Sequence, residues 1–370
     1  MLVTGVTSYL YMGTRQSRIA APIQKPVTVT PKPQAFTLPG TLYITQAGAI
    51  YSLSAGRFHQ LTAEDGWMQP SANPEGGLIA VKRSPMFSDV YSMTRLGQVT
   101  AQLTNNQAAP RDRWDPGANS WAFYPRLSPD GRTLWVSYDG PKYVNYGDPI
   151  YEVDLAVWAV PPGAPIRQGR MWTDANGYTG GDVQPVPVAG GAIIYTKYSY
   201  DNDYNRVGQL WYTNRARSSG RPLTPQAASC AQPSISPDGG SIAMICTGGK
   251  QVSNLVIASW NGASLGELRT VISDQLVAQP AWAPDGSGIA YLAPGSAGGF
   301  QLWFLPKNAY NPPAPSPLPT PTPTPGGPHN GPLPSPTPSP LPTPPVIKPI
   351  RLFPDLNLGL DATSPIVWVS

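Results

Sequence analysis

Residues Gln279–Leu292 read QPAWAPDGSGIAYL, a pattern that predicts a strand, a tight turn and a second strand. In the turn Pro284–Gly286, proline restricts φ, the aspartate accepts hydrogen bonds from nearby backbone N–H groups, and glycine adopts positive φ without steric penalty. Residues 289–292 are apolar and mostly strand-prone. Pro280 has no N–H for a strand ladder, so we expect it where the first strand begins. The segment is therefore a predicted β-hairpin.

The same hairpin recurs along the chain. Close copies start at Tyr124 and Gln232, each with the turn Ser-Pro-Asp-Gly, and more divergent copies start at Gln69 and Gln184. Repeats of roughly 40–50 residues that carry about four strands are typical of β-propeller blades. The marker prolines are separated by 55, 60, 48 and 47 residues and lie at Pro70, Pro125, Pro185, Pro233 and Pro280.

A third predicted strand follows each hairpin, and a fourth often ends in Leu-Thr. The third strands are predicted at 90–93, 150–153, 209–212, 255–258 and 301–305. This arrangement resembles the TolB-type propeller repeat, whose hallmark is the Ser-Pro-Asp-Gly turn followed by an Ile-Ala-aromatic strand. The resemblance covers most of residues 40–310 and the C-terminus. It implies a WD-like propeller of the cell envelope, or a secreted one, that docks other proteins.

The two ends of the chain each carry part of a blade. Residues 41–45, 49–53 and 58–62 match strands two, three and four but have no first strand before them, whereas Thr363–Val369 matches a first strand with nothing after it. Pairing the two parts completes one blade and leaves no open edge. The predicted fold is all-β, a six-bladed propeller closed by N- and C-terminal strands in one shared blade.

Proline marks the expected domain boundaries. Residues 1–39 form an apolar N-terminal stub and a Pro-containing lead-in, and residues 40–310 form the first part of the propeller. Residues 311–345, about half of them proline, are expected to be a disordered Pro/Thr/Ser-rich insert, because proline offers no ladder donors. Residues 346–370 complete the propeller. The uncharged stub 1–13 is too short to span a bilayer alone, so it is either the end of a membrane tether or an ordinary N-terminus.

Composition limits the partners and the compartment. The net charge is only +4, and no Lys/Arg run occurs, so nucleic acid is not expected as a partner. Cys230 and Cys246 lie on either side of one predicted turn, almost opposite each other. They form either a disulfide, in an extracytoplasmic protein, or two buried thiols. We expect a monomer.

Strand order separates two faces of the predicted propeller. The Pro-Asp-Gly turns lie on one face, and the loops after second and fourth strands lie on the other, where aromatic residues alternate with Asp, Asn and Arg. Such side chains bind proteins, peptides and glycans, although tyrosines can also pack long loops onto the blades. The candidate binding residues are Trp67, Arg113, Trp114, Trp121, Tyr138, Tyr143, Tyr146, Asp148, Tyr178, Tyr198, Tyr200 and Tyr204.

Signals for metal or catalysis are sparse. Asp201, Asp203 and Asn205 offer closely spaced oxygen ligands for calcium, the one cofactor considered. The only histidines are His59 and His329, which argues against a His-based triad. We therefore hypothesise a non-catalytic binding or scaffold protein. The alternatives are a polysaccharide lyase or glycosidase that uses Asp carboxylates, and an accessory propeller of a separate peptidase.

Overall fold

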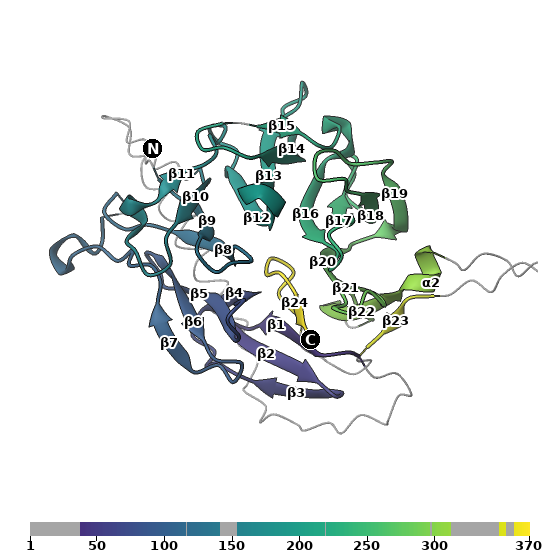
Figure 1. The fold of residues 1–370 in the computed structure, drawn as a ribbon, viewed down its shortest axis with the longest axis horizontal. Helices are drawn as coiled ribbons and strands as arrows, with labels where there is room; N and C mark the ends of the chain where they lie inside the picture. Colours follow the sequence, from purple (N-terminus) through teal and green to yellow (C-terminus); the bar gives the residue numbers. More distant parts are fainter. Residues whose placement is uncertain are drawn as a thin grey trace, which may run out of the picture. The chain divides into compact units, whose positions relative to one another are not determined.

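Six four-stranded antiparallel sheets form a β-propeller (Figure 1). The structure is a computed structural model that describes residues 38–115, 117–140, 154–218, 220–296, 298–311, 348–352 and 359–370. The sheets follow one another around a common centre, each with its first strand innermost. We number the blades 1 to 6 in chain order. The stub at 1–13 and nearly all of the proline-rich insert lie outside the described residues.

The blades share one plan, in which consecutive strands pair. Blade 1 contains β24 (Val367–Val369), β1 (Thr41–Gln46), β2 (Ala49–Ser54) and β3 (Arg57–Gln60), and blade 2 contains β4 (Trp67–Ala72), β5 (Leu78–Arg83), β6 (Ser88–Met93) and β7 (Val99–Gln102). Blade 3 contains β8 (Ala122–Leu127), β9 (Leu134–Tyr138), β10 (Ala156–Val160) and β11 (Arg170–Met171), and blade 4 contains β12 (Asp182–Val188), β13 (Ala192–Tyr200), β14 (Arg206–Thr213) and β15 (Arg221–Pro222). Blade 5 contains β16 (Cys230–Ile235), β17 (Ser241–Cys246), β18 (Ser253–Ser259) and β19 (Arg269–Gln275), and blade 6 contains β20 (Ala278–Trp282), β21 (Gly288–Pro294), β22 (Phe300–Pro306) and β23 (Ile350–Arg351).

The helices of the described residues are short and lie in the connections. They are the 3₁₀ turns η1 (Pro110–Asp112), η2 (Ile166–Gln168), η3 (Ala189–Gly191) and η4 (Gln226–Ala228), and the single-turn α2 (Lys307–Tyr310). Among the described residues, no helix is long and apolar enough to cross a membrane.

Blade 1 combines both ends of the described chain. The C-terminal strand β24 pairs with β1, with Leu42 opposite Trp368 and Tyr43 opposite Val367 (Figure 1). The Trp368 ring packs edge-on against Phe304 of blade 6, with ring centroids 5.8 Å apart. Burial of these large side chains is the main free-energy gain from placing the C-terminus here.

The proline after the first residue of each repeat lies inside the innermost strand and not at its start, contrary to our expectation. In β20, Gln279 and Pro280 together face the single residue Tyr291, which is a β-bulge. The bulge leaves the proline outside the ladder, so its missing N–H costs no ladder hydrogen bond. The residue before the proline adopts positive φ in five blades, at Gln69, Tyr124, Gln184, Gln232 and Gln279.

One expected strand is wrong. The third strand of blade 3 is β10 at Ala156–Val160, whereas the sequence pattern predicted 150–153, which lies outside the described residues. Both segments are rich in apolar residues, and the later one is paired with β9 in the structure. In blade 6, β23 pairs with β22 although residues 307–349 separate them in sequence.

The Pro-Asp-Gly turns bond internally. In blade 3, Asp130 Oδ1 accepts hydrogen bonds from the Ser128 hydroxyl and from the Arg132 N–H. The Ser128 hydroxyl first, and then the Arg132 amide, hold the pKa of Asp130 below its usual range. The Ser236 hydroxyl has the same effect on the pKa of Asp238. These carboxylates are therefore engaged by their own turns.

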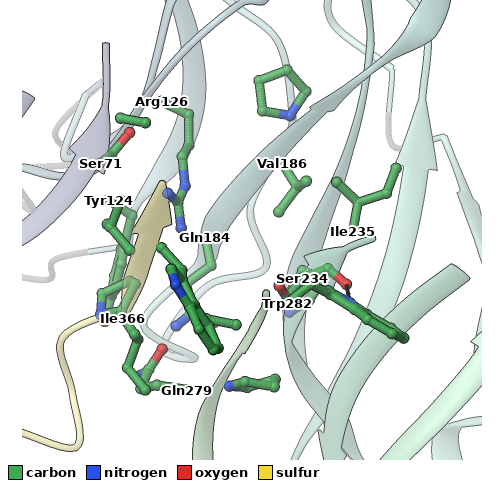
Figure 2. Close-up of a pocket in the computed structure, with 18 of the residues that line it drawn as sticks. Ser71, Tyr124, Arg126, Gln184, Val186, Ser234, Ile235, Gln279, Trp282 and Ile366 are labelled. Atoms are coloured by element: carbon green, nitrogen blue, oxygen red, sulfur yellow. Dashed lines mark hydrogen bonds between the residues drawn. The ribbon is translucent and has the colours of Figure 1, made fainter. Parts of the chain in front are cut away.

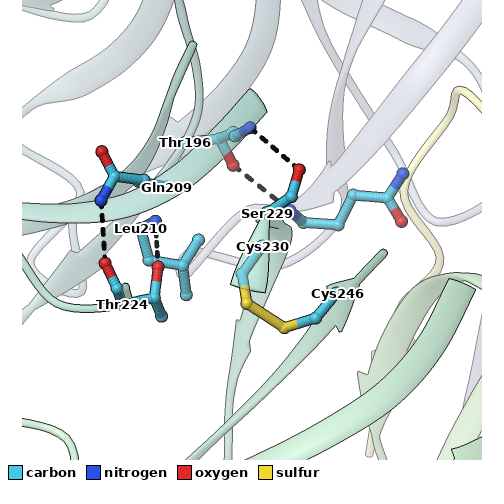
Figure 3. The surroundings of a disulfide bond; sticks show 9 residues. Thr196, Gln209, Leu210, Thr224, Ser229, Cys230 and Cys246 are labelled. Carbon is cyan, nitrogen blue, oxygen red and sulfur yellow. Dashed lines mark hydrogen bonds between the residues drawn. A yellow bond between two sulfur atoms is a disulfide. The ribbon is translucent and has the colours of Figure 1, made fainter. Parts of the chain in front are cut away.

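Cys230 and Cys246 face each other across β16 and β17 and are joined by a disulfide (Figure 3). Their Cα atoms are 4.0 Å apart, and both side chains are buried in the core between blades 4 and 5. The bond closes a loop of 16 residues in sequence separation. It therefore constrains the hairpin in the unfolded chain as well as in the fold.

Replacing both Cys230 and Cys246 with alanine should lower the free energy of unfolding by about 3 kcal/mol, because the unfolded hairpin regains conformational freedom. Denaturant titration measures this difference. Reductant should destabilise the wild-type protein but leave the double variant unchanged. Equal reductant sensitivity of both proteins, or two free thiols in non-reducing peptide mapping, would contradict the prediction.

Ser364→Ala should destabilise the fold by about 1–3 kcal/mol, the cost of unsatisfied buried polar groups. The buried Ser364 hydroxyl lies 2.8 Å from the Thr45 hydroxyl and accepts a 2.7 Å hydrogen bond from the Gln69 N–H, so it joins β1 and β4 to the C-terminus. Thr363→Ala is the control, since Thr363 is exposed and its loss should cost less than about 0.5 kcal/mol. Equal midpoints in chemical denaturation would disprove this role.

Candidate functional site

The two faces of the propeller differ in their exposed apolar side chains. We call the face with the first-to-second and third-to-fourth connections the turn face, and the opposite one the loop face. Leu96 and Val99 are exposed around the β6–β7 connection, which belongs to the turn face. The other five exposed large hydrophobic residues of the described chain belong to loop-face connections or their flanks: Trp114, Tyr178, Tyr200, Tyr204 and Leu276.

Three of these residues belong to blade 4 and define a tyrosine patch. Tyr178, Tyr200 and Tyr204 are 67%, 44% and 86% exposed. Tyr178 precedes β12, whereas Tyr200 and Tyr204 lie at the β13–β14 connection. The Tyr200 hydroxyl donates a 2.7 Å hydrogen bond to the Tyr178 carbonyl oxygen, which ties the two loops together.

Asp154 holds the Tyr178 loop in place. Its carboxylate accepts hydrogen bonds from the backbone N–H groups of Tyr178, Thr179 and Gly180, at 2.7, 3.0 and 2.8 Å. Three donors converging on one carboxylate fix the backbone of the loop tightly. The patch therefore presents its rings from a braced backbone.

A buried ion pair lies behind the same loop. Lys197 of β13 is 3.3 Å from Asp182 of β12 and also donates to the carbonyl oxygen of Asp174. Burial raises the pKa of Asp182 to about 6, and the Lys197 charge opposes this rise. The pair links the Tyr178 loop to the body of blade 4.

Several predicted binding residues are packed against neighbours. Trp67 is 6% exposed and meets Tyr91 edge-on, with ring centroids 5.5 Å apart. Tyr138 meets Trp158 in the same way at 5.6 Å. These rings present little surface to a ligand.

Other predicted residues pair with arginines. The Arg206 guanidinium lies 4.8 Å from the ring centroid of the half-buried Tyr198. Trp121, also half-buried, stacks on Phe123 and lies beneath Arg83. Arg113 lies 5.1 Å from the exposed Trp114 ring, and Tyr143, Tyr146 and Asp148 lie outside the described residues.

The predicted calcium ligands form a turn. Asp201 Oδ1 accepts hydrogen bonds from the N–H groups of Asp203 and Asn205, at 2.9 and 2.8 Å. These bonds hold the pKa of Asp201 below its usual range, the Asn205 amide contributing most. In the described part of the chain, no group of three or more His, Cys, Asp or Glu side chains could hold a metal ion. Calcium binding through Asp201, Asp203 and Asn205 stays a prediction.

A cavity of about 350 Å³ lies at the centre of the propeller (Figure 2). Its lining runs along the innermost strands from the residues before the bulge prolines to residues next to the turns, such as Pro129 and Trp282. It therefore reaches toward the turn face. Most of the lining is apolar or amide-bearing, and Arg126 is its one charged side chain among the described residues.

Arg126 extends from β8 into this cavity (Figure 2). It has no ion pair or hydrogen bond from its side chain among the described residues. Burial lowers the pKa of the Arg126 guanidinium to about 10, which still leaves it charged at neutral pH. A half-buried guanidinium that has no partner among the described residues, in a mostly apolar cavity, favours the binding of an anion.

Sequence reasoning missed Arg126, although its position carries a signal. It follows the bulge proline of its repeat. At the equivalent position the other repeats have small or apolar residues: Ser71, Val186, Ser234, Ala281 and Ile366. A single charged residue at a position that faces the propeller axis could have been noticed.

Comparison of the sequence with protein-family models gave no match, and comparison with curated proteins gave none either. Solved structures do resemble it. TolB from Acinetobacter baumannii superimposes with a TM-score of 0.52 at 14% identity, over 74% of this chain and 62% of that one, less than two thirds of its length. A puromycin-hydrolysing peptidase of Mycobacterium tuberculosis gives 0.46 at 13% identity, over 75% and 47%. The periplasmic gluconolactonase of Pseudomonas aeruginosa gives 0.43 at 15% identity, over 72% and 79%.

The chain has the fold of a TolB-like six-bladed β-propeller. The predicted resemblance to TolB-like propellers and the predicted six-bladed all-β propeller are thus confirmed. At these identities the likeness concerns the fold, and the function of the TolB-like propeller has to be argued from its own surface and cavity.

Asp154→Ala should loosen the Tyr178 loop of the TolB-like propeller, because three backbone donors lose their acceptor. We expect amide hydrogen exchange at residues 178–180 to accelerate at least about tenfold, which corresponds to about 1.4 kcal/mol of local stability. Asp203→Ala is the control, since Asp203 is an exposed carboxylate in the neighbouring loop. Unchanged exchange in Asp154→Ala would show that the loop is braced by other contacts.

Proposed function

We propose that this TolB-like propeller is an extracytoplasmic binding or scaffold protein that recognises a protein, peptide or glycan through its loop face. The observation that carries the proposal is the tyrosine patch, in which three exposed rings stand on hydrogen-bonded loops of blade 4. Tyrosines supply large contact area at low conformational-entropy cost, and their hydroxyls can hydrogen-bond a partner.

The braced backbone supports recognition by this patch. Association costs free energy when loops must be ordered, and a pre-ordered loop avoids part of that cost. Asp154 and Lys197 both hold the Tyr178 loop before any partner arrives. Binding loops carried on a rigid scaffold are a common arrangement in propellers and related folds.

The disulfide supports an extracytoplasmic location. Disulfides persist in secreted and envelope compartments and are rare where thiols are kept reduced. Cys230 and Cys246 are paired in a buried position with the geometry of neighbouring strands.

The carbohydrate-enzyme alternative has less support among the described residues. A glycosidase acid needs a raised pKa and a second carboxylate nearby. Asp182 has a raised pKa, but it is fully buried and paired with Lys197. The pKa values of Asp130, Asp238 and Asp285 are all lowered by hydrogen bonds within their turns. The cavity lining offers a cation in place of a pair of acids. The accessory role to a peptidase would use the same loop or turn surfaces and stays an alternative.

The triple variant Tyr178→Ser, Tyr200→Ser and Tyr204→Ser should weaken binding at least about tenfold, since buried tyrosines often contribute about 2 kcal/mol or more each at an interface. The probes are a displayed random-peptide library and a glycan array, and affinities of the selected binders are measured by surface plasmon resonance.

The matched control is the double variant Leu96→Ser and Val99→Ser, which removes exposed apolar side chains at the β6–β7 connection. It should bind the selected peptides or glycans as the wild-type protein does. If the triple variant retains full affinity, or if only the control loses it, the loop face is not the recognition surface.

A further inference from the structure

The central cavity contains a charged group that the tyrosine patch does not use. Arg126 projects into it from blade 3, and no carboxylate of the described chain pairs with it. The cavity extends to the turn face, away from the tyrosine patch. It is therefore a second and separate site.

Two hydrogen bonds between neighbouring bulges lie beside the cavity. Gln69 Oε1 accepts from the Tyr124 N–H at 2.7 Å, and Gln232 Oε1 accepts from the Gln279 N–H at 2.7 Å. In each case the side chain of one bulge residue bonds the backbone of the next blade. In these two places the glutamine side chain satisfies a backbone group that the bulge releases from the ladder.

Blade 4 does not make this bond to blade 5. Gln184 is the equivalent residue there, but the N–H of Gln232 in the next blade bonds the Thr196 hydroxyl instead. The buried Gln184 Oε1 is left without a hydrogen-bond partner. Gln184 lies on β12, beside β8, and lines the same cavity as Arg126 (Figure 2).

The cavity thus offers three kinds of contact. Arg126 supplies a guanidinium whose planar fork matches a carboxylate. Gln184 supplies an acceptor for a ligand N–H or O–H group. Val186, Ile235 and Trp282 supply apolar wall. A volume of about 350 Å³ is near the lower end for ligand pockets, enough for one small molecule or the end of a peptide.

We propose that the central cavity binds a carboxylate next to a hydrogen-bond donor and an apolar group, with the carboxylate on Arg126 and the donor on Gln184. N-acylated amino acids and the C-terminal residue of a peptide share this chemistry. Binding places the anion against the unpaired guanidinium and gives the Gln184 oxygen its missing donor.

Isothermal titration calorimetry of the full chain with three probes tests the chemistry. N-acetyl-leucine carries all three groups, N-acetyl-leucinamide lacks the charge, and 4-methylpentanoate lacks the N–H. We expect N-acetyl-leucine to bind at least about tenfold more tightly than N-acetyl-leucinamide, since a hydrogen bond to a charged group contributes about 1.5–3 kcal/mol. It should also bind more tightly than 4-methylpentanoate, which leaves the Gln184 oxygen without a donor, by about 0.5–1.5 kcal/mol, the contribution of a neutral hydrogen bond. Similar affinities for the acid and the amide would overturn the proposal.

A second arm distinguishes the source of the carboxylate. Acetyl-Ala-Ala-Leu is compared with its C-terminal amide. Tighter binding of the free-acid peptide than of N-acetyl-leucine identifies a peptide terminus, whereas preference for N-acetyl-leucine identifies a small free acid. Absence of binding by both acids up to about 10 mM would refute the proposal.

Arg126→Gln should reduce the affinity for N-acetyl-leucine at least about tenfold, and Arg126→Lys should lose less, because a lysine keeps the charge but not the fork. Arg132→Gln is the matched control, since Arg132 is exposed on the β8–β9 turn of the same blade and is absent from the cavity lining. Thermal denaturation confirms that each variant is folded. Unaltered affinity in both Arg126 variants would exclude this residue as the anion site.

Binding of a carboxylate in the central cavity does not depend on the proposed binding at the loop face. The triple tyrosine variant should bind N-acetyl-leucine with wild-type affinity, and Arg126→Gln should leave the peptides or glycans selected on the loop face unaffected. Loss of N-acetyl-leucine binding in the tyrosine variant would contradict a separate central site.

Discussion

The innermost strands depend on hydrogen bonds that cross from one bulge to the next blade. Each bulge places a non-glycine residue at positive φ before a proline, a conformation that costs on the order of 1–3 kcal/mol. The backbone N–H freed at Tyr124 bonds the side chain of Gln69, and that at Gln279 bonds Gln232. The Ser364 hydroxyl likewise accepts a hydrogen bond from the Gln69 N–H and so connects the C-terminal segment to blade 2. These bulge residues therefore join neighbouring blades, together with other polar contacts such as that between Ser88 of blade 2 and Ala122 of blade 3.

The bulges also determine which side chains line the central cavity. A bulge turns side chains near the axis inward, and the narrow space between six such strands is lined mainly by proline, glutamine and apolar residues. In blade 4 the Gln184 oxygen has no donor, because the Gln232 N–H bonds Thr196 instead. In the neighbouring blade 3, Arg126 occupies the position at which the other blades have small or apolar residues. The departures from the repeat fall on adjacent strands, and that is why they create one polar site and not two isolated ones.

The loops on the loop face are stabilised differently from the innermost strands. They lie beyond the reach of the ladders, so side chains must satisfy and hold their backbone. Asp154 does this for the Tyr178 loop, and Lys197 ties Asp174 to blade 4 from behind. With the backbone of the Tyr178 loop held in this way, Tyr178 and Tyr204 remain largely exposed. Trp67 shows the opposite outcome, since its ring is buried against Tyr91 and Lys82. Aromatic residues on this side of the propeller therefore differ in role according to their neighbours.

The sequence by itself determined the hairpins, the repeat, the six blades and the strand pairing expected for Cys230 and Cys246. Turn chemistry such as Pro284–Gly286 acts over a few residues, so its pattern is visible in the chain. The sequence did not predict the third strand of blade 3, the bulge positions of the prolines or the burial of Trp67, because each depends on partners distant in sequence. Arg126 and Gln184 are 58 residues apart in the chain, and only the closing of the sheets around one axis brings them into one cavity. Tertiary structure therefore decided the candidate sites, since burial and hydrogen-bond partners come from neighbouring blades.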